Sequence, residues 1–157
     1  PQGCTSFAVY GTLRPDCDSG APWTKEFVAT RTGCVSARVF GFKMWTKKQR
    51  SANYPCSVPS DQQTDSVFVK VVTFANDWDA KLVEADKIEE YDPYNPQDSW
   101  YHRRVVQAHI VHDATGELTG GTIAAVMYFI PALDADVQYF PVPEGDWLKR
   151  EHDFVLE

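Results

Sequence analysis

The chain reads Phe7-Ala8-Val9-Tyr10-Gly11-Thr12-Leu13-Arg14-Pro15 near its start, and this stretch predicts a strand that ends in a shaped turn. Its first four residues are apolar or aromatic, as in a strand with a buried face, and glycine and proline then interrupt the pattern. Glycine adopts positive φ and lets a ligand approach the bare backbone. Successive N–H groups in such a turn form a concave site for a carboxylate or a developing oxyanion. A strand followed by glycine is also typical of an ordinary turn, so this stretch alone does not establish a binding site.

Four further segments have the patterns of strands. Residues 34–45 alternate as one long strand with a bulge or tight bend at Gly41, and residues 67–74 form the clearest β-branched run. Residues 101–112 and 122–130 also read as strands, separated by a turn at Asp113-Ala114-Thr115-Gly116.

One segment has a clear helical period. The apolar residues that repeat at steps of 4, 3 and 3 are Trp78, Leu82, Ala85 and Ile88. Asn76 or Asp77 is in position to cap this helix, and we expect it to end near Tyr91-Asp92-Pro93. Residues 22–29 form either a short helix or an irregular excursion.

These elements predict the fold class. At least five strands with one clear helix exclude a doubly wound parallel sheet, because each parallel connection needs a crossover of about a dozen residues or more. We expect an α+β fold, a small mixed β-barrel with few flanking helices. The 157 residues suit a single domain, residues 1–157, in which residues 141–157 wrap the surface with Trp147 as an anchor.

The composition limits the partners. The chain is 43% hydrophobic and 24% charged, with a formal net charge of −7, and this charge repels phosphate backbones and anionic membranes. No run of about 18 apolar residues is present. Lys47, Lys48 and Arg50 beside Trp45 favour a solvated turn over an RNA contact. We expect a small-molecule partner, no nucleic acid and no membrane, and a monomer or a homodimer.

The start of the sequence bears on localisation. Pro1 is not followed by a basic segment and an apolar stretch, which favours the cytoplasm, while a cleaved signal stays open because the sequence does not start with Met.

Cysteines and histidines show no metal-binding pattern. The four cysteines, Cys4, Cys17, Cys34 and Cys56, contain no C-x-x-C pair. Two disulfides remain open, but free thiols are favoured because a domain of this size needs no covalent staple. His109 and His112 point to opposite faces of one predicted strand, and no cysteine has a recognisable nucleophile context. We expect neither a metal nor another cofactor.

Carboxylates cluster at the end of the predicted helix, as Glu84, Asp86, Glu89 and Glu90. Glu89 follows Ile88 and lies at the edge of the buried stripe. The negative end of the helix dipole and partial burial would both raise its pKa toward that of a general base. The alternative is a solvated acidic helix face.

The chain resembles the γ-glutamylcyclotransferase-like family, which includes the AIG2-like proteins. The resemblance rests on ordered motifs: Phe7-Ala8-Val9-Tyr10-Gly11-Thr12-Leu13-Arg14, Gly41, Tyr54-Pro55, Asp86-x-x-Glu89, Tyr101-x-Arg103-x-x-Val106 and Val126-x-Tyr128. Gly145-Asp146-Trp147 also looks like a terminal element found in part of the family. The matches cover most of the chain, and their order is more specific than any one of them.

The resemblance implies an acyltransferase or lyase that converts a γ-glutamyl amine, amino acid or peptide to 5-oxoproline and releases the amine. The family's catalytic glutamate maps to Glu89. A glycine is common at the next position, where this chain has Glu90, so which carboxylate enters the cavity stays open, and the spacing from Asp86 favours Glu89. The implied substrate-binding residues are Tyr10, Gly11, Thr12, Leu13, Tyr101, Arg103 and Tyr128.

Other readings of the same residues stay open. The three tyrosines also fit a core or wall role, and Arg103 also fits an ion pair with an acidic neighbour. The chain as a whole also fits a non-catalytic small-ligand-binding or interaction module on the same fold, or a lyase or hydrolase of a different amide. The leaving amine is not specified, although Asp16, Asp18 and the loop at residues 92–100 would suit a cationic one.

Overall fold

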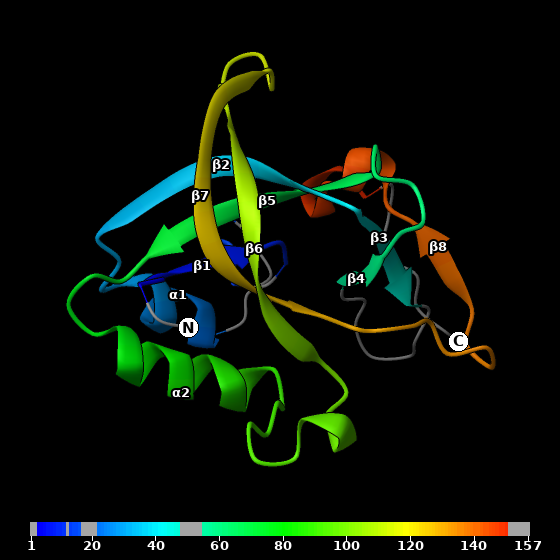
Figure 1. The fold of residues 1–157 in the computed structure, drawn as a ribbon, viewed down its shortest axis with the longest axis horizontal. Coiled ribbons are helices and arrows are strands. Elements are labelled where there is room, and N and C mark those ends of the chain that lie inside the picture. Colours follow the sequence, from blue (N-terminus) through cyan, green and yellow to red (C-terminus); the bar gives the residue numbers. More distant parts are fainter. Residues whose placement is uncertain (1–2, 12, 17–21, 48–54, 151–157) are drawn as a thin grey trace.

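A computed structural model describes residues 3–11, 13–16, 22–47 and 55–150 (Figure 1). The strands are β1 (Ser6–Val9), β2 (Gly33–Phe40), β3 (Phe42–Lys47), β4 (Pro55–Pro59), β5 (Ser66–Thr73), β6 (His102–Val111), β7 (Leu118–Phe129) and β8 (Tyr139–Pro141). The α-helices are α1 (Pro22–Val28) and α2 (Trp78–Ile88). Three short 3₁₀ helices are η1 (Pro96–Asp98), η2 (Pro143–Gly145) and η3 (Trp147–Lys149).

Five strands close into a barrel in the order β1-β5-β2-β6-β7. All of its pairs are antiparallel except the parallel contact of β1 with β7, where Phe7 lies opposite Val126. The two helices lie on one side of the barrel (Figure 1). This arrangement confirms the predicted α+β fold and small mixed β-barrel.

The structure corrects the prediction of one long strand over residues 34–45. β2 belongs to the barrel, whereas β3 belongs to a second sheet of order β4-β3-β8. The two strands separate at Gly41, whose φ of +83° is the left-handed conformation that a residue with a side chain rarely adopts. The sequence reading missed β4 and β8 because both are short and carry proline at their ends.

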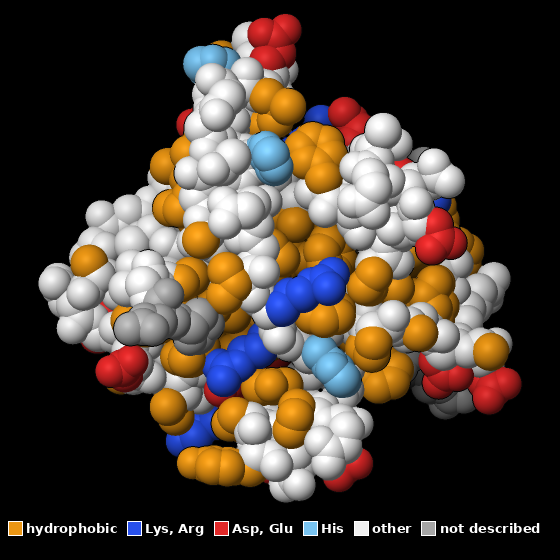
Figure 2. All heavy atoms as spheres, viewed as in Figure 1, with side chains coloured by type: hydrophobic (Ala, Val, Ile, Leu, Met, Phe, Trp, Pro, Cys, Tyr) orange, Lys and Arg blue, Asp and Glu red, His pale blue; other side chains and the backbone are white. Residues whose placement is uncertain are grey.

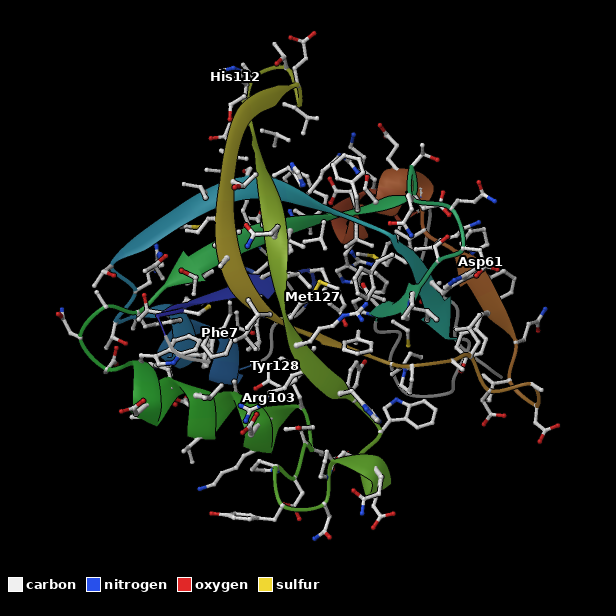
Figure 3. The ribbon with its side chains drawn as sticks, viewed as in Figure 1. Phe7, Asp61, Arg103, His112, Met127 and Tyr128 are labelled. Atoms are coloured by element: carbon white, nitrogen blue, oxygen red, sulfur yellow. The ribbon has the colours of Figure 1, made fainter. Side chains whose placement is uncertain are left out.

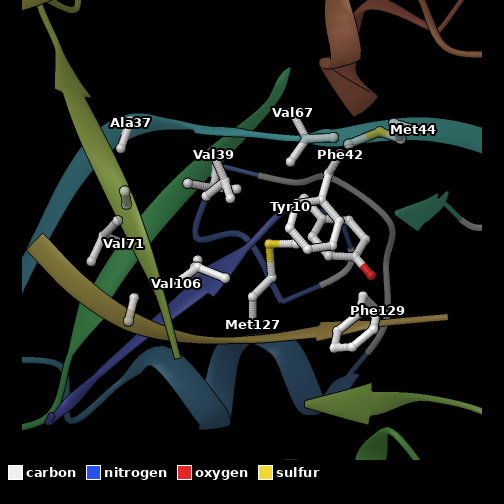
Figure 4. Packing of buried hydrophobic residues seen from close by; sticks show 14 of the residues in the cluster. Tyr10, Ala37, Val39, Phe42, Met44, Val67, Val71, Val106, Met127 and Phe129 are labelled. Atoms are coloured by element: carbon white, nitrogen blue, oxygen red, sulfur yellow. The ribbon is translucent and has the colours of Figure 1, made fainter. Parts of the chain in front are cut away.

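Successive residues of β7 point alternately into two different apolar clusters. Ala125, Met127 and Phe129 point into the barrel, where Figure 4 shows Met127 and Phe129 beside Tyr10. Val126 and Tyr128 point the other way, toward the helices. A period of two therefore lets one strand fill the barrel and also support α2.

Helix α2 covers the barrel with the face expected from its sequence. Ala85 is buried, and Trp78, Leu82 and Ile88 pack against the same cluster as Phe7. Asp77, one of the two predicted cap residues, is the N-cap of the helix, but its side chain makes no cap hydrogen bond. The helix also ends at Ile88, a few residues before the expected end.

The segment after β8 returns to the barrel. Trp147 is 2% exposed and lies in the cluster that fills the barrel, which confirms its role as an anchor. Gly145 has a φ of +63°, and a Cβ there would lie 2.3 Å from the carbonyl oxygen of Ser66. Close contact with β5 therefore requires glycine at this position.

Several sequence expectations concern residues that the structure does not describe or describes only in part. Thr12, Cys17, Asp18 and Tyr54 lie outside the described residues, and so do Lys48, Arg50 and residues 151–157. Cys4 and Cys34 are free thiols, and Cys56 is buried. Across the described ranges, no helix is both long and apolar enough to span a bilayer.

Candidate active site

The end of α2 determines how two neighbouring carboxylates are oriented. The Tyr91 N–H donates to the Asp86 carbonyl (2.8 Å) and the Glu90 N–H donates to the Lys87 carbonyl (3.3 Å), as in a Schellman motif. Glu90 has a φ of +53°, in the position where such motifs favour glycine. The backbone reverses there, and Glu90 is exposed while Glu89 is partly buried.

Glu89 lies in a desolvated environment. Burial raises the pKa of its carboxyl to about 7. Its charge also contributes to the raised pKa values of Tyr10 and Tyr128, after the larger effect of burial in both. Glu89 is therefore close enough to these two tyrosines for its charge to affect them, and its pKa lies near neutral pH, where a carboxyl both accepts and donates a proton.

Tyr10 connects the Glu89 environment to the turn after β1. The Tyr10 hydroxyl donates to the Tyr128 carbonyl (2.7 Å) and is buried. The next residue, Gly11, has no room for a side chain, because a Cβ there would lie 2.6 Å from Cγ of Pro55. The sequence pattern Tyr-Gly thus places a buried hydroxyl and a bare backbone segment next to each other.

The turn itself is anchored from two sides. The Arg14 N–H donates to the Gly11 carbonyl (3.0 Å), and the Leu13 side chain is buried in the cluster on the helix side. The Arg14 guanidinium is almost fully buried and forms ion pairs with Asp16 (2.7 Å) and Asp146 (2.8 Å). A buried arginine with two carboxylates holds the backbone of the turn in place.

Two of the candidate residues named from the sequence, Tyr128 and Arg103, donate hydrogen bonds to Asp86. The Tyr128 hydroxyl donates to Asp86 Oδ1 (2.6 Å), and Arg103 Nη1 donates to the same oxygen (3.0 Å). The Arg103 guanidinium also lies 4.9 Å from the ring centre of Tyr91. Figure 3 shows Arg103 and Tyr128 between the barrel and the end of α2. This network supports the helix turn that carries Glu89.

The surroundings of Asp86 also change its pKa. Burial raises the pKa of Asp86, and the hydrogen bond from Tyr128 and the charge of Arg103 only partly oppose that effect. The remaining sequence candidate, Tyr101, donates its hydroxyl to the Pro55 carbonyl (3.2 Å), beside Gly11. The structure therefore brings together every described candidate around the end of β1 and the end of α2.

Sequence reasoning missed two contributors. Asp146 was noted only as part of a terminal motif, and its pairing with Arg14 spans 132 residues, a separation that no local pattern reveals. Arg104 was not singled out, although strand alternation already places it on the same face of β6 as Val106.

The described residues contain no group of three or more histidine, cysteine, aspartate or glutamate side chains that could hold a metal ion.

Comparison with known proteins places this geometry in context. Residues 7–149 match the family model described as gamma-glutamyl cyclotransferase, AIG2-like. No curated protein sequence matches the chain significantly.

Solved structures share the fold at low sequence identity. YkqA from Bacillus subtilis is 18% identical with a TM-score of 0.55, and the alignment covers 91% of this chain and 39% of YkqA. An AIG2-like protein from Mus musculus is 15% identical with a TM-score of 0.55, covering 87% of this chain and 85% of that protein. A γ-glutamyl cyclotransferase specific to glutathione from yeast is 12% identical with a TM-score of 0.51, covering 88% and 73%.

Proposed function

The chain belongs to the gamma-glutamyl cyclotransferase, AIG2-like family, and from this premise we propose that it is an enzyme that cyclises a γ-glutamyl amine, amino acid or peptide to 5-oxoproline and releases the amine. The observation that carries the proposal is the Glu89 carboxyl, which burial brings to a pKa of about 7 beside Tyr10. At neutral pH such a group is about half ionised and can serve as base and then as acid.

The reaction needs little more than positioning and proton transfer. A γ-glutamyl substrate carries its own nucleophile, the α-amine, which attacks the γ-carbonyl when the chain is folded into a ring. Glu89 takes a proton from the α-ammonium group, and the free amine then attacks the γ-carbonyl to form a tetrahedral intermediate. Glu89 donates that proton to the leaving nitrogen as the amide bond breaks, and the second proton lost by the ring nitrogen protonates the released amine. The products are 5-oxoproline and a free amine, and no atoms beyond those of the substrate are required.

The turn after β1 has the role of holding the substrate. Backbone N–H groups of Gly11 and Leu13 would bind the α-carboxylate or the tetrahedral oxyanion, and Gly11 permits close approach. The contact between Gly11 and Pro55 and the buried Arg14 support this role, because both fix the backbone in advance. Tyr10, Tyr101 and Tyr128 would line the site, with Tyr128 and Arg103 held by Asp86.

The decisive experiment measures 5-oxoproline and free amine over a panel of γ-glutamyl amino acids, γ-glutamyl-ε-lysine and γ-glutamyl alkylamines. General acid–base catalysis typically contributes about 10²–10⁴-fold, so Glu89→Gln should lower kcat/KM by at least about 100-fold. Glu90→Gln is the matched control, since it removes an adjacent carboxylate that is exposed, and it should keep the parental rate.

Each other outcome has a defined meaning. Parental turnover in Glu89→Gln would refute the assignment of the base. Ligand binding without turnover by folded parent protein would favour the non-catalytic binding module. Release of amine without 5-oxoproline would instead favour a hydrolase or lyase of a different amide.

A further inference from the structure

One basic side chain at the end of the barrel forms no ion pair with any carboxylate that the structure describes. Arg104 is exposed, and its guanidinium carbon lies 4.8 Å from the ring centres of both Phe42 and Phe129. The two rings are themselves in contact, with centroids 5.7 Å apart. Contact with two aromatic rings restricts the guanidinium, which lowers the entropy lost when it binds a ligand.

None of the described carboxylates neutralises the charge of Arg104. No carboxylate in the described part of the chain forms an ion pair with it, although its neighbour Arg103 is paired with Asp86. His102 lies on the same side of β6, with its ring 6.1 Å from that of Phe129. In Figure 2, basic side chains and a histidine lie near the centre of the face, over a recessed apolar surface, and acidic side chains lie mostly toward the edges.

Arg104 lies next to the candidate active site. Phe42 and Phe129 belong to the same buried cluster as Tyr10, and the Tyr10 hydroxyl binds the carbonyl of the residue before Phe129. Figure 4 shows the rings of Tyr10, Phe42 and Phe129 grouped at this end of the barrel. Arg104 therefore contacts two rings that are grouped with Tyr10, whose pKa burial and, to a smaller extent, the Glu89 charge raise.

Two of the acidic residues expected near this site have partners within the structure. Asp16 is paired with the buried Arg14 and lies 3.9 Å from the Lys70 amine. Asp92 accepts hydrogen bonds from the Tyr94 N–H (2.9 Å) and the Asn95 side chain (3.3 Å), within its own loop. Asp18, which the same expectation named, lies outside the described residues.

From these contacts we infer that Arg104 binds a carboxylate on the amine side of the scissile bond, so that the preferred substrates release an amino acid or peptide rather than an alkylamine. This inference rests on the proposed function and adds the chemistry of the leaving group. A guanidinium offers two parallel N–H donors to a carboxylate, a geometry that an alkylamine cannot use. The carboxylate of the leaving group lies away from the reacting atoms, and binding it allows the enzyme to distinguish between substrates.

The test uses two matched pairs of substrates. γ-Glutamyl-alanine is compared with γ-glutamyl-ethylamine, and γ-glutamyl-ε-lysine with γ-glutamyl-cadaverine, since each pair differs only by the carboxylate of the leaving group. A charge-assisted hydrogen bond to a carboxylate contributes enough for a preference of about 10-fold or more in kcat/KM in at least one pair. Arg104→Gln should abolish that preference and leave turnover of the alkylamine within about twofold, and Arg104→Lys should keep part of it.

The controls separate this inference from the proposed function. Arg31→Gln removes an exposed arginine that donates to the Val28 carbonyl near α1, and it should leave the preference unchanged. An unchanged preference in Arg104→Gln, or no preference in the parent, would overturn the inference while leaving cyclisation intact. A parent that forms no 5-oxoproline from any of the four substrates would refute the proposed function, and the carboxylate site with it.

Discussion

Glu89 should reduce the stability of the protein at neutral pH, and Glu89→Gln should reverse this effect. Burial raises the folded-state pKa of this carboxyl from 4.5 to about 7. Between those values the folded state binds a proton that the unfolded chain has released, so the free energy of unfolding falls as pH rises. The contribution is fully favourable below the ordinary pKa and is lost as pH rises through the folded value.

The size of the effect follows from the linkage relation. With these two pKa values, the free energy of unfolding should fall by about 2.5 kcal/mol between about pH 5 and about pH 8 through this group alone. Because Glu89 is only partly buried, solvent screens part of this effect, and we expect a fall of about 2 kcal/mol. Glutamine carries no charge, so the Glu89→Gln variant should gain this amount relative to the parent over the same range.

The assay is urea unfolding followed by tryptophan fluorescence, at about half-unit steps of pH, for the parent, Glu89→Gln and Glu90→Gln. The difference between two variants cancels the pH dependence that all carboxylates share. Glu90→Gln should show a constant difference from the parent, because that carboxyl is exposed. A difference for Glu89→Gln that is equally constant with pH would show that the carboxyl ionises as in water, and would refute the argument from burial.

Three further changes test other parts of the structure. Glu90→Gly should raise stability by about 1 kcal/mol, because φ is +53° there, and a melting temperature at or below the parental value would contradict the Schellman assignment. Asp146→Ala should cost about 3 kcal/mol in urea unfolding, since it leaves the buried Arg14 with one carboxylate; a loss under about 0.5 kcal/mol would show that the pair is not structural. Gly11→Ala should cost about 1–3 kcal/mol and lower kcat/KM, because the new Cβ would overlap Pro55; full activity would argue against a rigid turn.

The sequence predicted the parts of the fold that depend on local patterns. The β-branched run of β5 and the period of α2 were both identified, because each pattern reflects burial of one continuous face. The β2–β3 boundary was mistaken for a bend within one strand. Gly41 marked its position, but a change of sheet depends on partners far along the chain.

The candidate site was predictable in its residues but not in its arrangement. The neighbouring carboxylates Glu89 and Glu90 look alike in sequence, and only the backbone reversal at Glu90 shows which one is desolvated. In the same way, Tyr128 and Arg103 appeared as separate candidates, and their common partner Asp86 emerges only when α2 packs on the barrel. Contacts between distant parts of the chain determine these roles, and local sequence patterns do not predict such contacts.

The pairing of β1 with both β5 and β7 has a consequence for synthesis on the ribosome. Phe7 cannot meet Val126 until nearly the whole barrel has been translated, so during elongation the β1 edge has its β5 neighbour at most. Such distant contacts slow folding, and an open edge invites pairing with other chains. We therefore expect the nascent chain to be most prone to aggregate before β7 emerges, and to need protection by chaperones in that interval.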